Sequence, residues 1–182
     1  RHPNIELLAY SEVESLEGEA GDFKATVRRK ARYVDEDKCT GCGACAEKCP
    51  TVVPDAFNEG LGERSAIYSW FAQGIPSTHT IDPDHCRQLN GKKCGICAKT
   101  CQADAVNFDQ KDRMVELNVG AVIVASGYEV FDPSRIPEYQ YQSIPNVVTA
   151  IEFERLLSAS GPTGGHLHRP SDRAIEAEIA TL

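Results

Sequence analysis

The chain has 182 residues, which is enough for one ordinary domain or two small ones. Hydrophobic residues make up 41% of it and the mean hydropathy is −0.35, values typical of a soluble globular protein, and no apolar run approaches the roughly 18 residues that a membrane span requires. The formal charge of −8, from 19 basic and 27 acidic residues, argues against a nucleic-acid-binding protein.

The first 34 residues predict a β-hairpin. We expect strands at residues 5–10 and 13–16, a turn at 18–22, and a further strand from residue 23 to residue 28. In that last strand, apolar residues at 23, 25 and 27 alternate with polar residues, the pattern of a half-buried strand. A hairpin buries little surface alone, so it should lie at the edge of a larger structure.

Four cysteines follow within eleven residues, at Cys39, Cys42, Cys45 and Cys49, with Pro50 directly behind them. This run is C-x2-C-x2-C-x3-C-P, the pattern whose thiolates hold a [4Fe–4S] cluster in bacterial ferredoxins. Gly41 and Gly43 allow the backbone to curl around such a cluster without a Cβ penalty. The run therefore predicts a first iron–sulfur site.

The other four cysteines form a second set at Cys86, Cys94, Cys97 and Cys101. Its first gap is seven residues instead of two, and we expect this loop to bulge outward and return Cys94 to the cluster. The residues between the two sets predict a short helix over 63–73. His79 and His85 are read as ordinary loop histidines, because eight cysteines already supply the ligands of two cubes.

In two-cluster ferredoxins the fourth cysteine of each run ligates the other cluster. Applied here, this rule predicts two ligand sets: Cys39, Cys42, Cys45 and Cys101 for one cluster, and Cys86, Cys94, Cys97 and Cys49 for the other. Zinc would also take clustered thiolates, although zinc sites usually split two and two across a longer loop. Disulfides would require an oxidising compartment.

Residues 114–117 predict a strand, and the apolar, β-branched run at 119–128 predicts a buried central strand of an α/β sheet. If residues 35–112 are removed, the strands at 23–29 and 114–117 become neighbours, which indicates an inserted domain. A helix is expected at 150–158, and the glycine-rich residues 161–165 are read as its C-terminal cap and loop. The chain contains no G-x-G-x-x-G fingerprint.

The run at 120–128 resembles the Ala-Thr-Gly strand of thioredoxin-reductase-like flavoproteins, with Ser126 at the threonine position. In order, the hairpin, the two cysteine sets and the Ala-Ser-Gly strand resemble the A-type subunit of heterodisulfide reductase. The resemblance implies an α+β chain in which a bacterial-type 2[4Fe–4S] ferredoxin domain (35–112) is inserted into part of an α/β FAD domain (1–34 and 113–182). It implies FAD contacts at Ala125, Ser126 and Gly127 in the full-length subunit, and it leaves residues 173–182 without a counterpart.

The resemblance further implies a role in electron transfer, within a complex that performs flavin-based electron bifurcation. Its partners would be other subunits of a heterodisulfide reductase-type complex, with a hydrogenase or ferredoxin as redox partners. We expect a cytoplasmic fragment of an oxidoreductase subunit that transfers electrons and has no catalytic residues of its own. Two alternatives stay open, a stand-alone 2[4Fe–4S] electron carrier and a zinc-stapled interaction module.

Overall fold

The computed structural model describes residues 2–171, which fall into two compact units. Unit 1 comprises the described residues up to Thr51 together with Ser65–Ser126, and it contains all eight cysteines. Unit 2 comprises Val52–Arg64 and the described residues from Gly127 onward. Short helices and strands are mixed along the chain, which fits the predicted α+β class.

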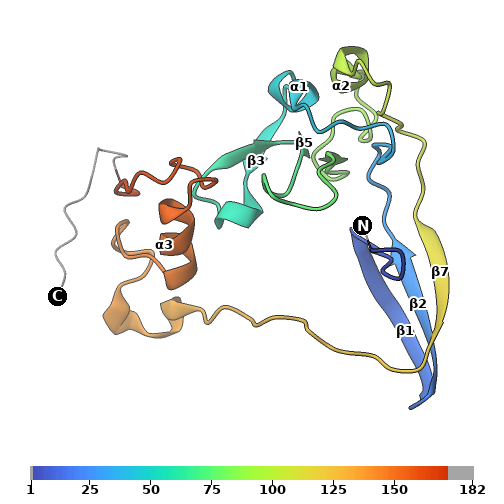
Figure 1. Cartoon of the computed structure of the whole chain (residues 1–182). Coiled ribbons are helices and arrows are strands. Elements are labelled where there is room, and N and C mark those ends of the chain that lie inside the picture. The colour runs from blue at the N-terminus through green and yellow to red at the C-terminus, as the bar shows by residue number, and fades with distance from the viewer. Residues whose placement is uncertain (1, 172–182) are drawn as a thin grey trace. The chain divides into compact units, whose positions relative to one another are not determined.

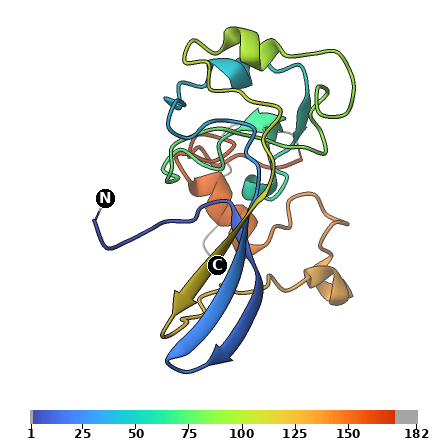
Figure 2. The same cartoon turned by 90° about the vertical axis from the view of Figure 1, so that its right-hand side faces the viewer.

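Three antiparallel strands form the main sheet of unit 1, in the order β1, β2, β7 (Figures 1 and 2). Their bounds are Ser11–Glu19 for β1, Asp22–Arg29 for β2 and Arg113–Val119 for β7. The β1–β2 turn needs a glycine at Gly18, which has φ +100° and where a Cβ would lie 2.1 Å from the Asp22 carbonyl oxygen. The predicted hairpin is therefore confirmed.

The separate strand predicted at residues 5–10 is wrong. These residues form no strand, and β1 instead runs unbroken from Ser11. Tyr10 has φ 56°, outside the extended region, so the chain turns sharply just before β1. An extended segment without a strand beside it has no ladder to join, and local sequence pattern does not reveal whether such a neighbour exists.

The register of the sheet places apolar residues opposite one another across all three strands. Val27 pairs with Val13 on one side and Val115 on the other, and Ala25 pairs in the same way with Leu16 and Leu117. Ala25 and Val27 are buried at the centre of this face. Alternation along β2 puts Ala25 and Val27 on one face, since successive side chains of a strand point to opposite faces. A register shift between Val13 and Ser15 lets Val13 and Leu16 of β1 both lie opposite them.

β2 and β7 lie side by side although more than eighty residues separate them, from Phe23 opposite Val119 to Arg29 opposite Arg113. This confirms the prediction that these two strands are neighbours. Beyond them the chain is joined again, because the Ala31 N–H donates to Asp112 Oδ1 at 2.9 Å and the Asn107 N–H donates to the Tyr33 carbonyl at 2.9 Å. The cysteine-bearing segment thus leaves and re-enters the sheet at one place.

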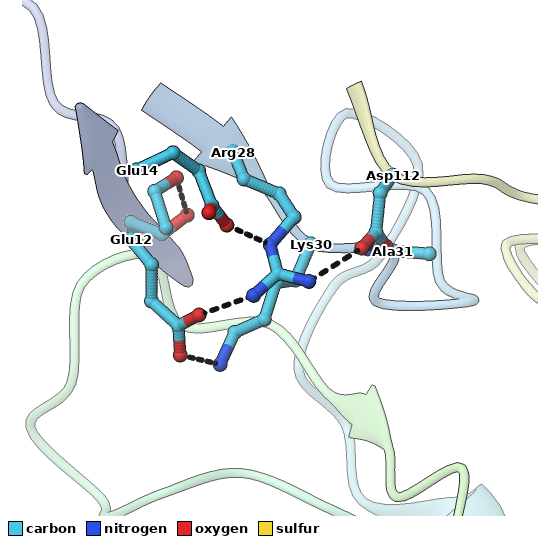
Figure 3. Close-up of polar contacts among 8 residues, drawn as sticks. Glu12, Glu14, Arg28, Lys30, Ala31 and Asp112 are labelled. Carbon is cyan, nitrogen blue, oxygen red and sulfur yellow. Dashed lines mark hydrogen bonds and ion pairs between the residues drawn. The ribbon is translucent and has the colours of Figure 1, made fainter. Parts of the chain in front are cut away.

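Charged side chains surround this junction (Figure 3). Arg28 on β2 contacts Glu12 at 2.7 Å and Glu14 at 2.6 Å on β1, and it approaches Asp112 at 3.8 Å on the returning chain. Lys30 also contacts Glu12 at 2.7 Å. Hydrogen bonds from Lys30, the larger cause, and from Arg28 hold the pKa of Glu12 below its usual value. One arginine therefore connects both strands of the hairpin to the end of the cysteine-bearing segment.

The rest of unit 1 packs around a small core made of Val34, Ile67, Ile81, Cys86, Cys97 and Ala105. Short elements supply it: the paired strands β5 (Ile67–Tyr68) and β6 (Thr80–Ile81), and the helices α1 (Ala44–Glu47) and α2 (Ile96–Thr100). The helix predicted at 63–73 is wrong. The Ala66 N–H donates to Thr51 and the Ala66 carbonyl accepts from Asp82, so long-range pairing overrides local helix propensity.

The buried central strand predicted at residues 119–128 is also wrong for this chain. β7 ends at Val119, residues 120–128 form no regular structure, and Ile123 and Val124 are 92% and 81% exposed. A central strand requires a strand on each side and a covering layer on each face. No described residue supplies either, so the apolar run lies open to solvent.

Unit 2 contains α3 (Ala150–Leu157), which confirms the helix predicted at 150–158. A capping box between Thr149 and Glu152 starts it, and Arg155 lies buried against the Phe57 ring at 4.7 Å. A Cβ on Gly161 would lie 1.9 Å from the Arg155 carbonyl, which explains the glycine after the helix.

The other elements are short. β3 (Val52–Pro54) pairs with β4 (Glu63–Ser65). The first two residues of β4 belong to unit 2, and its last residue, Ser65, belongs to unit 1. Three 3₁₀ turns lie in unit 2, at Ala56–Asn58, Pro133–Arg135 and Pro137–Tyr139. Residues 172–182, which include the segment 173–182 that the resemblance leaves without a counterpart, lie outside the described residues.

We predict that the Asp112 hydrogen bond holds the two ends of the cysteine-bearing segment together. Asp112→Ala leaves the N–H of buried Ala31 without its acceptor, which should cost about 1–2 kcal/mol of unfolding free energy and speed hydrogen exchange of the Ala31 amide. Asp112→Asn keeps an oxygen at the same place and is the matched control. Unchanged Ala31 exchange in the alanine variant would contradict this role.

Candidate iron–sulfur site

The first cysteine set lies on a tightly curled loop that leads into α1. Gly41 has φ +71° and Gly43, the residue before α1, has φ +82°. A Cβ on Gly41 would lie 2.5 Å from the Ser77 carbonyl oxygen, so this loop closely approaches the chain that leads to β6. Left-handed glycines thus turn the backbone so that Cys39, Cys42 and Cys45 follow one another around a curve.

The second set repeats this arrangement. Gly95 has φ +93° and lies directly before α2, which carries Cys97. In the same way, Gly43 lies directly before α1, which carries Cys45. The two helices lie side by side at one end of unit 1 (Figures 1 and 2). Each helix has only one turn, so the two runs form paired loops that face the same core.

Four cysteines line one small apolar cavity of unit 1. They are Cys86, Cys94 and Cys97 from the second set and Cys49 from the first. Ala66, Ile67 and Ile81 form much of the remaining wall. A cavity lined by four thiols and apolar side chains suits a group that binds through sulfur and is shielded from water. The four cysteines of this cavity are the ones that the two-cluster ferredoxin rule assigns to the second cluster.

The remaining cysteines are partly brought together. Cys45 interacts electrostatically with Cys39 of its own set and Cys101 of the second set, whereas Cys42 is exposed. All eight cysteines are free thiols. Among residues 2–171, no three histidine, cysteine or acidic side chains are placed to hold a single metal ion.

Burial changes the acid–base properties of two central thiols. Desolvation raises the pKa of Cys45 to about 11, and the nearby Cys39 and Cys101 thiols add to this. Desolvation likewise raises the pKa of Cys97 to about 11, with smaller contributions from Cys86, Cys45 and Cys49. Both thiols must lose their protons to bind iron, so cluster binding is coupled to proton release.

The seven-residue gap in the second set is an ordered loop. The Asn90 amide donates to the carbonyls of Pro83 at 2.8 Å, Asp84 at 3.2 Å and Cys86 at 2.9 Å. Gln88 Oε1 accepts from the Cys94 N–H at 3.0 Å. These two amide side chains position both ends of the loop. Sequence reasoning missed them, and the only available signal was a pair of amide residues inside an unusually long gap.

The two histidines near the second set differ from each other. His85 is exposed and contacts Asp82 at 3.0 Å, as expected of a loop histidine. His79 is only 6% exposed, its Nδ1 has no hydrogen-bond partner in the structure, and burial lowers its pKa. The neighbouring Thr78 hydroxyl is likewise buried without a partner. Two unused polar groups thus lie close in sequence to Ser77, which touches the first cysteine loop.

The three residues predicted to approach FAD, Ala125, Ser126 and Gly127, lie outside any helix or strand. All three are exposed, with Ala125 and Ser126 at the end of unit 1 and Gly127 in unit 2. Gly127 has φ +77°. The structure thus lines one cavity with four of the predicted metal ligands and packs Cys39, Cys45 and Cys101 against the core of unit 1.

Comparison with known proteins identifies the relatives of this chain. Residues 32–55 match the model of a 4Fe–4S binding domain. The sequence is 50% identical over 171 residues to the A-type iron–sulfur subunit of CoB–CoM heterodisulfide reductase from Methanocaldococcus jannaschii, covering 94% of this chain and 25% of that protein. The chain is homologous to a segment of the A-type subunit of heterodisulfide reductase.

Other A-type subunits show the same relationship. Identity is 53% over 182 residues with the second A-type iron–sulfur subunit of Methanopyrus kandleri, which covers 100% of this chain and 27% of that protein. It is 45% over 182 residues with the A-type subunit of the H₂:CoB–CoM heterodisulfide, ferredoxin reductase of Methanothermobacter thermautotrophicus, at the same coverage. The chain spans about a quarter of the length of these heterodisulfide reductase subunits. None of the helices in residues 2–171 has the length and apolar character needed to cross a membrane.

We predict that Cys45 and Cys97 react slowly with iodoacetamide in the metal-free folded chain at pH 8. With a pKa of about 11, only about one such thiol in a thousand is a thiolate at that pH, and alkylation should accelerate about tenfold per pH unit up to pH 10. Site-resolved mass spectrometry measures this. The urea-unfolded chain is the control, and equal rates in both states would contradict the burial argument.

Proposed function

We propose that this chain holds two [4Fe–4S] clusters and passes single electrons between them. The observation that carries the proposal is the cavity lined by Cys49, Cys86, Cys94 and Cys97, which unites cysteines from both sequence sets. The match of residues 32–55 to a 4Fe–4S binding domain supports the same chemistry. Each cluster, when bound, accepts or donates one electron.

The ligands of the first cluster would be Cys39, Cys42, Cys45 and Cys101, and those of the second would be Cys86, Cys94, Cys97 and Cys49. Cys39, Cys45 and Cys101 all pack against the small core of unit 1, as the first assignment requires. Ile67 and Ile81, each almost fully buried, exclude water from the second site. Low polarity around a cluster is one of the factors that set its reduction potential.

We further propose that residues 35–112 form a domain inserted into a flavin-binding domain, to which residues 1–34 and 113–182 belong. The pairing of β2 with β7 supports this, since it brings the two ends of the segment together. The exposed apolar run at 120–128 would be covered by further strands of that domain. Ala125, Ser126 and Gly127 would then allow the backbone to approach FAD closely.

The names of the relatives suggest the reaction. They are heterodisulfide reductase subunits, and some of the names include H₂ or ferredoxin. We propose that this chain relays electrons within such an oxidoreductase, in which FAD divides an electron pair between a disulfide and a ferredoxin. Other subunits of the complex, a hydrogenase and ferredoxin would be its partners. We expect it in the cytoplasm, where thiols stay reduced.

Substitution of the fourth cysteine in each set tests the ligand assignment. We predict that Cys49→Ala damages the cluster held by Cys86, Cys94 and Cys97, whereas Cys101→Ala damages the cluster held by Cys39, Cys42 and Cys45. Iron and sulfide content should fall from about eight each per chain towards about four. Electron paramagnetic resonance of the reduced variants identifies which cluster is lost.

The two variants are each other's controls, because each removes one thiol. Loss of the cluster nearest in sequence to the substituted cysteine, with the other intact, would show that each set holds its own cluster. Wild-type protein that carries tightly bound zinc and no sulfide would overturn the iron–sulfur assignment altogether.

FAD binding by the isolated chain is a separate test. We predict weak binding or none, because no G-x-G-x-x-G turn is present to hold the pyrophosphate and the Ala125–Gly127 backbone is open to solvent. Isothermal titration calorimetry measures the affinity, and a longer protein that includes a dinucleotide-binding fingerprint is the control. Sub-micromolar affinity of the 182-residue chain would contradict the prediction.

A further inference from the structure

Four cations are concentrated beside the second cysteine set. Arg87, Lys92 and Lys93 belong to the long loop between Cys86 and Cys94, and Lys99 lies on α2. All four side chains are exposed, and none forms an ion pair or hydrogen bond with a described residue. They place four positive charges together on a chain whose net charge is −8.

Several cations on and beside the sheet of unit 1 are paired with nearby acids. Lys24 contacts Glu116 at 3.2 Å, Arg28 contacts Glu12 at 2.7 Å, and Arg32 contacts Glu36 at 2.6 Å. The positive charge of Lys24, Arg28 and Arg32 is therefore compensated within the protein. The charge of the loop at residues 87–93 and of Lys99 is left available to an external partner.

These cations lie next to the proposed second cluster. Arg87 itself lines the cavity together with Cys86 and Cys94, and so does Ile96, whose side chain is 40% exposed. The surface outside this wall thus combines positive charge with an apolar contact point. That combination suits a redox partner, since electrostatic attraction speeds encounter and a small apolar centre excludes water.

The loop is also held in shape before any partner arrives. The Asn90 amide donates to three backbone carbonyls at one end, and Gln88 accepts from the Cys94 N–H at the other. An ordered loop loses little conformational entropy when it binds. The extra residues of the second set, which depart from the ferredoxin pattern, therefore build a defined basic surface instead of a loose bulge.

We propose that residues 87–93 with Ile96 and Lys99 form a basic docking surface for an acidic one-electron carrier protein. The oxidised carrier binds there and takes one electron from the reduced second cluster, so that the cluster is oxidised by one electron and the carrier is reduced by one. The inference rests on the proposed function, because it needs a cluster behind the surface. It adds the place where electrons leave towards the carrier and the charge of that partner.

A charge-reversal experiment tests this on the reconstituted 182-residue chain. The probe is an acidic [2Fe–2S] ferredoxin, whose spectrum differs from that of a cubane, and stopped-flow absorbance gives the second-order rate constant of electron transfer. Lys92→Glu with Lys93→Glu should lower this constant at least about tenfold at low ionic strength, and the loss should shrink as salt screens the charges. Lys99→Glu alone should lower it about threefold.

The matched control is Lys111→Glu with Arg113→Glu. Both residues are exposed, lack ion pairs with described residues and change the net charge by the same amount, but they lie at the start of β7. The control should change the rate constant less than about twofold. Equal losses in both double variants, or no loss in the loop variants, would overturn the docking surface.

Iron and sulfide content and the electron paramagnetic resonance spectrum of each reduced variant separate the two proposals. Wild-type protein with two clusters but rates indifferent to the loop charges would refute the docking surface alone. Wild-type protein that takes up no clusters would refute the proposed function, and the docking surface with it.

Discussion

Pairing of β2 with β7 is the constraint on which unit 1 depends, because it brings residues 29 and 113 opposite each other and closes the cysteine-bearing segment into a loop with a fixed base. Closing so long a loop costs conformational entropy, although that cost grows only slowly with length. The ladder between the strands and the Asp112 hydrogen bond to Ala31 offset it. Without this base, Cys101 would have no defined position relative to Cys39 and Cys45.

The cysteine loops are too short to be stable alone. α1 has four residues and α2 has five, far below the length at which an isolated helix persists in water. Left-handed Gly43 and Gly95 set their direction, and the core around Val34, Ile67 and Ile81 holds them in place. A cluster bound by thiolates from both loops would connect them, so that metal binding contributes directly to folding.

Charge is distributed unevenly over this acidic chain. Glu12 and Glu36 form ion pairs with Arg28 and Arg32 beside the sheet, whereas the cations of the loop before Cys94 are exposed and have no ion-pair partner among the described residues. Hydrogen bonds made by Gln88 and Asn90 give that loop its shape without using a charged group. Neutral amides thus hold the loop together, which leaves the lysines for interaction with another molecule.

The sequence by itself determined the chemistry and the connection between distant segments. Cysteine spacing indicated the cluster motif, alternation at residues 23–28 predicted the half-buried strand, and removal of residues 35–112 predicted the β2–β7 neighbours. These features depend on residue type and short-range periodicity, and both can be read directly from the amino-acid sequence. The helix at 150–158 was equally predictable from its apolar pattern and the glycines that follow it.

Tertiary structure alone decided the rest. Residues 63–73 became short strands because Ala66 pairs with Thr51 and Asp82, and residues 120–128 stayed open because no described strand lies beside them. The gathering of Cys49 with Cys86, Cys94 and Cys97, and the positions of Gln88 and Asn90, likewise depend on contacts between distant residues. A backbone hydrogen bond needs a partner, and the position of that partner is a property of the folded chain and not of any local stretch of sequence.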